Sequence, residues 1–80
     1  MDREIIIERL TPVVREVFAD DSLVVTDAMS AETVAAWTSL SFMQLLAKIE
    51  SEFNIKFKIF ELINIHCMGD LLDSIAAHCA

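Results

Sequence analysis

Residues 3–18 alternate apolar and charged side chains with helical spacing. The apolar positions of this segment are Ile6, Leu10, Val13, Val14, Val17 and Phe18. Because steps of three and four residues fall on one face, the pattern predicts an amphipathic helix. Pro12 lies inside it, and a proline in a helix interior costs about 3 kcal/mol. The segment therefore forms either a helix kinked at Pro12 or one that starts nearer Thr11, and we prefer the former because it keeps the whole stripe.

Residues 19–38 lack a sustained hydrophobic period and are rich in turn and cap formers. They predict a long loop, which is unusual in a compact domain and often functional. The apolar side chains expected to pin this loop onto the helices are Leu23, Val24, Val25 and Met29. Trp37, the only tryptophan, is expected to anchor its far end.

Residues 39–53 carry the strongest helical pattern, with Thr38 as a good N-cap and Asn54 as the expected end. The predicted core face consists of Phe42, Leu45, Leu46, Ile49 and Phe53. A second apolar row consists of Leu40, Met43 and Ala47. This row either packs against a short third helix or forms a docking stripe for partner proteins.

The last third of the chain predicts a short extended stretch and two more helices. Residues 55–58 alternate like an extended segment, and Phe60, Leu62 and Ile63 suggest one or two helical turns. Gly69 and Asp70 open a final helix, whose expected stripe is Leu71, Leu72, Ile75, Ala76 and Cys79.

We therefore predict an all-α fold: a small four-helix bundle, with three main helices, a short third helix and a long loop after the first. Residues 1–80 are expected to form a single domain.

Composition and charge limit the classes of partner. The chain is 55% hydrophobic, which suits a packed core, and its net charge of −7 argues against nucleic acid. That charge either suits a basic partner or only keeps a small hydrophobic domain soluble.

The longest unbroken apolar run, residues 34–37, is far shorter than the roughly 20 residues of a membrane span. The start resembles no secretory signal, so we expect a cytoplasmic protein with reduced Cys67 and Cys79.

Catalytic and metal sites find little support in the sequence. Ser39 lacks the glycines of a hydrolase nucleophile elbow, and nothing in the sequence places His66 or His78 near it. The dipeptides His66-Cys67 and His78-Cys79 could offer zinc ligands, but their spacing is not that of a zinc site. We predict no catalytic residue and no metal site.

Ser39 has one further chemical use, as a point of covalent attachment. A serine in the first turn of a helix lies beside backbone N–H groups without helical partners, at the positive end of the helix dipole. A phosphate ester is electrostatically favoured there.

Four segments resemble the acyl carrier protein family: Trp37-Thr38-Ser39-Leu40, "IESEFNIKF", "ELINI" and "MGDLLDSI". The resemblance covers nearly the whole chain and implies a carrier rather than an enzyme. In that family, the serine of an Asp-Ser-Leu motif receives 4′-phosphopantetheine from coenzyme A through a phosphopantetheinyl transferase. The thiol of this arm then holds an acyl group as a thioester. The resemblance implies that Ser39 is the attachment residue.

The resemblance also implies how partners dock. The family binds its acyl-loading and acyl-transferring enzymes through the helix after the serine, which here offers Leu40, Met43, Ala47 and Glu50. It further implies a monomer that works in fatty acid or polyketide biosynthesis.

Four positions depart from the family pattern. Thr38 replaces the aspartate and offers the modifying enzyme no carboxylate. Ser41 and Gln44, expected to be exposed, are neutral where acidic residues are usual, which favours apolar docking. Cys67 stands where an N-cap Ser or Thr is expected, which weakens that cap by about 1 kcal/mol. Two alternatives stay open: a helical adaptor that is never modified, and a carrier of peptidyl or aminoacyl groups.

Overall fold

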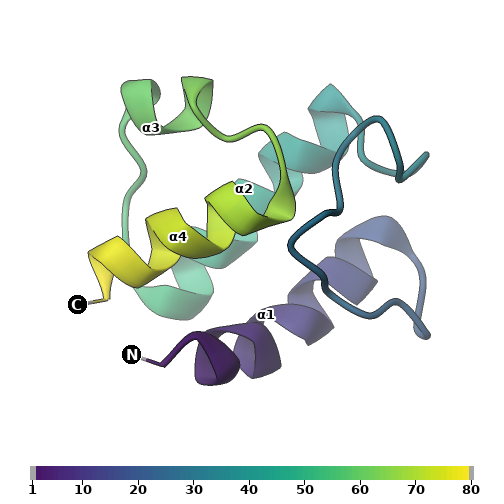
Figure 1. The fold of residues 1–80 in the computed structure, drawn as a ribbon, viewed down its shortest axis with the longest axis horizontal. Helices are drawn as coiled ribbons and strands as arrows, with labels where there is room; N and C mark the ends of the chain where they lie inside the picture. The colour runs from purple at the N-terminus through teal and green to yellow at the C-terminus, as the bar shows by residue number, and fades with distance from the viewer. Residues whose placement is uncertain (1, 80) are drawn as a thin grey trace.

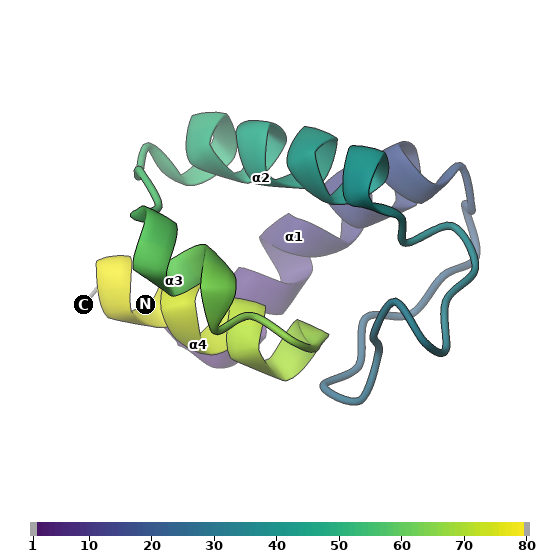
Figure 2. The same cartoon turned by 90° about the horizontal axis from the view of Figure 1, so that it is seen from above.

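The computed structural model describes residues 2–79, which form four helices and no strand. In chain order these are α1 (Arg3–Phe18), α2 (Ser39–Phe53), α3 (Ile59–Ile63) and α4 (Met68–His78). Helix α1 packs against both α2 and α4. The long loop 19–38 lies at the opposite side of the molecule from the start of α1 and the end of α4 (Figures 1 and 2). The predicted all-α bundle with a short third helix and a long first loop is confirmed.

Helix α1 continues through Pro12, so a start nearer Thr11 is wrong. Pro12 faces solvent, and the Thr11 hydroxyl donates to the Ile7 carbonyl at 2.6 Å. The helix ends at Ala19, which adopts a left-handed conformation with φ 53°. Asn54, the predicted end of α2, adopts the same left-handed conformation with φ 54°.

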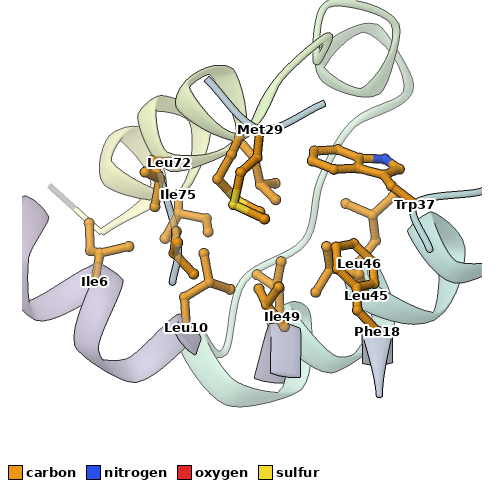
Figure 3. Packing of buried hydrophobic residues seen from close by; sticks show 14 of the residues in the cluster. Ile6, Leu10, Phe18, Met29, Trp37, Leu45, Leu46, Ile49, Leu72 and Ile75 are labelled. Atoms are coloured by element: carbon orange, nitrogen blue, oxygen red, sulfur yellow. The ribbon is translucent and has the colours of Figure 1, made fainter. Parts of the chain in front are cut away.

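The three longer helices bury their predicted stripes in one core (Figure 3). Its helical members are Ile6, Leu10, Val14, Phe18, Leu45, Leu46, Ile49, Phe53, Met68, Leu71, Leu72 and Ile75. The loop adds Val25, Met29 and Trp37, which confirms that Trp37 anchors its far end. Val24 does not pin the loop, because 70% of it is exposed.

Carbonyl groups of the long loop cap the start of α4. The N–H of Met68 donates to the Met29 carbonyl at 2.7 Å, and the N–H of Gly69 donates to the Asp27 carbonyl at 3.0 Å. Cys67 makes no side-chain cap, as expected, so these backbone bonds replace it. A Cβ at position 69 would lie 3.3 Å from Asp27 atoms, so glycine permits this close approach.

Helix α3 buries no residue and is held mainly by polar contacts. The Glu61 carboxylate accepts from the backbone N–H of Lys58 at 2.6 Å and lies 2.9 Å from Nε2 of His78. The His78 ring also meets the edge of Phe57, with ring centroids 5.7 Å apart. Glu61 therefore links α3 to the end of α4.

We expect Glu61→Gln to lower the melting temperature by roughly 2–5 °C near neutral pH. In acid, the variant and the wild type should melt at the same temperature. The Lys58 N–H, followed by the His78 side chain, lowers the pKa of Glu61 below its ordinary 4.5. A carboxyl with a depressed folded-state pKa stabilises the fold above its unfolded-state pKa, and this contribution is lost as pH falls through the folded-state pKa. Melting curves recorded from about pH 7 to about pH 3 measure the effect. Glu8→Gln controls for removal of an exposed charge, and a Glu61→Gln effect that persists in acid would contradict this explanation.

Candidate modification site at the start of α2

A reciprocal capping box fixes the first turn of α2 on both sides of Ser39. The backbone N–H of Ser41 donates to Oγ1 of Thr38 at 3.1 Å. In return, the N–H of Thr38 donates to Oγ of Ser41 at 2.8 Å. The predicted N-cap role of Thr38 is confirmed. Ser39, which lies between the two, is held at a defined place in the first turn.

Ser41 is buried, so the expectation of an exposed polar residue at this position is wrong. Its hydroxyl donates to the Ala36 carbonyl at 2.7 Å as well as accepting from Thr38. The physical reason is the capping box, which turns the third helical residue back toward the N-cap. Glu or Gln usually fills that position, but the pair Thr38 and Ser41 at the right spacing was the signal available in the sequence.

Ser39 is exposed, and its hydroxyl makes no hydrogen bond within residues 2–79. The capping box uses the N–H groups of Thr38 and Ser41, while Phe42 donates to the Thr38 carbonyl at 2.9 Å. The N–H groups of Ser39 and Leu40 keep no partner in the described part of the chain. Two free donors at the positive end of a helix dipole therefore lie beside the Ser39 hydroxyl, where they favour a phosphate group.

An open depression of about 490 Å³ adjoins Ser39. Its lining residues are Ala31, Glu32, Trp37, Thr38, Ser39, Phe42, Ile65 and His66. Trp37 stacks on Phe42, with ring centroids 5.9 Å apart and an interplanar angle of 19°. Trp37 is buried and reaches toward the core from the end of the loop (Figure 3). The base of the depression is therefore aromatic and apolar.

The fold brings His66 to the same depression as Ser39, which the sequence had not indicated. Glu32 lines it as well, yet no hydrogen bond joins any two of these three side chains within residues 2–79. The backbone N–H of His66 donates to the Asp70 carboxylate at 3.0 Å. A hydrolase needs a nucleophile bonded to its base, and this arrangement does not provide that pair.

The second apolar row of α2 is exposed to solvent. Leu40 is 70% exposed and Met43 is 60% exposed, while Ala47 also lies on the surface. Packing of the row against α3 is therefore wrong for these residues. Gln44 is exposed as expected, and the first turn of α2 contains no acidic residue. The surface directly after Ser39 is thus apolar and uncharged.

Glu50 lies half-buried near the end of this row and has a structural contact. Its Oε2 accepts from the backbone N–H of Phe57 at 2.9 Å, which holds the extended stretch against α2. One carboxylate oxygen is thereby occupied within the chain, so Glu50 is less available to a partner than its sequence position suggested.

The two His-Cys dipeptides lie apart, at the two ends of α4. The 11 residues of α4 separate Cys67 from Cys79. The resulting helical rise of about 18 Å is far too long for a disulfide between them. Within residues 2–79, no three His, Cys, Asp or Glu side chains are placed to hold a metal ion. In the same range, no helix is both long and apolar enough to cross a membrane.

Comparisons with known proteins were made by sequence family, by sequence and by structure. No protein-family model matches the chain, and neither does any curated protein sequence. The chain is similar to the holo acyl carrier protein from Geobacter metallireducens, whose solution NMR structure it matches with a TM-score of 0.85 at 41% sequence identity. The match covers 91% of this chain and 84% of that protein.

Proposed function

The chain belongs to the acyl carrier protein family, and we propose that Ser39 is the residue on which it carries 4′-phosphopantetheine. The protein is a carrier, not an enzyme. The observation that supports Ser39 is its exposed, unbonded hydroxyl beside the free N–H groups of Ser39 and Leu40. The capping box fixes the backbone on both sides of Ser39, and the arm's phosphate would sit at the positive end of α2.

The modification would be made by a phosphopantetheinyl transferase. Oγ of Ser39 would attack the phosphorus that bears the pantetheine arm of coenzyme A and lose its proton to a base. A new O–P bond forms, the pyrophosphate P–O bond to the nucleotide half breaks, and that half leaves with the bonding electron pair as a phosphate. The resulting arm ends in a thiol that holds the acyl group as a thioester. Tethering then raises the local concentration of this acyl group at each partner enzyme.

Partners would dock on the exposed row of α2. We assign this role to Leu40, Met43 and Ala47, with Glu50 at its edge, for the transferase and for acyl-loading and acyl-transferring enzymes. Residues 1–80 would act as one domain and as a cytoplasmic monomer. The cargo would be an acyl intermediate of fatty acid or polyketide synthesis, or a peptidyl or aminoacyl group on the same arm.

Thr38 supports one competing function, a helical adaptor that keeps the fold without the arm. Its side chain is committed to the cap through Ser41 and carries no charge. A transferase that relies on a carboxylate at this position would find no ligand there for its magnesium ion. The adaptor would bind partners through the same α2 row but would never be modified.

Intact mass distinguishes the carrier from the adaptor. We expect co-expression with a broad-specificity transferase to add one phosphopantetheine to the wild-type chain. Thr38→Asp should speed the addition by about tenfold, since one charge-assisted contact is worth about that factor. Thr38→Asn is the matched control, because it keeps the cap but adds no charge. Wild-type protein that stays unmodified with several transferases would favour the adaptor.

A further inference from the structure

Among the residues that line the depression beside Ser39, only His66 can carry a positive charge. His66 is exposed and lies in the connection between α3 and α4, which turns beside the first turns of α2 (Figure 1). An ordinary histidine titrates near pH 6.5, so its charge changes within the physiological range. The depression therefore contains a cation whose presence depends on pH.

The ring of His66 makes no hydrogen bond within residues 2–79. Only its backbone N–H is engaged, because it donates to the Asp70 carboxylate at 3.0 Å. The other histidine differs in this respect, since Nε2 of His78 lies 2.9 Å from the Glu61 carboxylate. Both ring nitrogens of His66 are thus open to a ligand in the depression.

The other groups that line the depression are uncharged or negative. The long loop contributes Glu32, which forms no hydrogen bond with His66. The start of α2 contributes Thr38, Ser39 and Phe42, and its first turn contains no acidic residue. A negative group attached to Ser39 would therefore meet one like charge and one possible opposite charge.

Helix α4 contributes one further carboxylate near His66. The N–H of His66, followed by the Cys67 side chain, lowers the pKa of Asp70 below its ordinary 3.8. Asp70 therefore stays charged where histidine titrates, and its charge favours the protonated ring. Glu61 and Asp73 line a neighbouring depression with Asp70, but each is already paired with another side chain.

We propose that the protonated ring of His66 is the counter-ion of the phosphodiester carried on Ser39, and that it sets the direction in which the arm leaves the protein. The inference rests on the proposed modification of Ser39 and adds a positioning residue to it. A phosphodiester keeps its negative charge throughout the range in which histidine titrates. Glu32 repels this charge and protonated His66 attracts it, so the arm is drawn toward the connection between α3 and α4 and away from the long loop.

This attraction acts on the histidine as well as on the arm. An anion near a histidine favours the protonated ring, so the arm should raise the pH at which His66 loses its proton. The contact is present below that pH and is lost as pH rises through it. The arm is therefore held toward residues 65–67 in mildly acidic solution and released in basic solution.

The test compares the unmodified full-length chain with the modified one, after intact mass has verified complete modification. NMR follows the imidazole titrations of both histidines at about 0.15 M salt. We expect the midpoint of the His66 titration to rise by about 0.5 pH unit on modification, which is a roughly threefold change in proton affinity. His78 is the internal control, and its midpoint should stay the same because the 11 residues of α4 separate it from His66.

The ³¹P signal of the phosphodiester provides a second readout. Its chemical shift should change with pH at the same midpoint as His66, and His66→Gln should remove this change between about pH 5 and pH 8. Glu32→Gln is the matched variant, because it removes a charge from the same depression but keeps the ring. The rise in the His66 midpoint on modification should persist in it.

A charge placed at residue 39 without a transferase separates this inference from the proposed function. Ser39→Glu should raise the His66 midpoint by about 0.3 pH unit relative to Ser39→Gln, whether or not the wild-type chain accepts the arm. A wild-type chain that gains no mass would count against modification of Ser39, whereas equal midpoints in these two variants would count against His66 as the counter-ion.

Two further results would overturn the role of His66 in a chain that is fully modified. One is an His66 midpoint that is the same with and without the arm. The other is a pH dependence of the ³¹P signal that survives His66→Gln.

Discussion

Ser39→Ala is expected to remove the entire phosphopantetheine addition that a transferase gives the wild-type chain. The hydroxyl oxygen is the atom that would form the bond to phosphorus, so its loss permits no partial reaction. Ser39 is exposed and makes no side-chain hydrogen bond within residues 2–79, so the variant should keep its stability to within about 0.5 kcal/mol. Intact mass measures the addition, and a melting curve verifies the fold.

Two other serines of α2 provide matched controls. Ser51 is exposed on the same helix, and Ser51→Ala should be modified like the wild type. Ser41→Ala keeps the attachment atom but removes the bonds to Thr38 and Ala36, so it should slow modification and destabilise the fold by about 1–3 kcal/mol. Full modification of Ser39→Ala, mapped to another serine by peptide sequencing, would contradict the assignment.

The helices were predictable because local periodicity alone places their apolar residues. The stripe from Phe42 to Phe53 and the stop at Asn54 both follow from spacing and from cap chemistry, with no knowledge of the fold. Tertiary contacts were not predictable in this way. Arg3 bonds both Asp27 and Asp73, residues from the loop and from α4, and no short-range pattern reveals such a contact. The same holds for the loop carbonyls that cap α4.

The attachment serine and its helix cap were predictable from the sequence, but the other residues of the candidate site were not. Ser39 and the Thr38 cap follow from position in the helix, whereas burial of Ser41 depends on the return bond of the capping box. His66 reaches the depression beside Ser39 only because the chain folds back between α3 and α4. The sequence indicated α3 from Phe60, Leu62 and Ile63. It did not indicate that Phe60 and Ile63 remain exposed, because the spacing of apolar residues does not show whether another element covers them.

Met43→Ala is expected to weaken the complex with the modifying transferase by about 1.5–3 kcal/mol, which corresponds to a roughly 10- to 150-fold rise in KM. Met43 is 60% exposed in the unbound chain, so a partner that covers it gains most of the free energy of burying a methionine side chain. The same exposure means that little of the fold depends on Met43, and the free energy of unfolding should change by less than about 0.5 kcal/mol. Steady-state kinetics with the purified transferase measure the effect.

Glu50→Gln is the comparison that separates apolar from electrostatic docking. Glutamine keeps an acceptor for the Phe57 N–H but removes the charge, so the variant should cost only the ~0–1 kcal/mol of an exposed ion pair. Val24→Ala removes exposed apolar surface from the long loop and should leave KM unchanged. Because salt screens charge but not apolar contact, the Met43→Ala penalty should be similar at low and high salt. Binding that survives Met43→Ala, yet weakens with Glu50→Gln and with salt, would make the carboxylate and not the apolar row the main docking determinant.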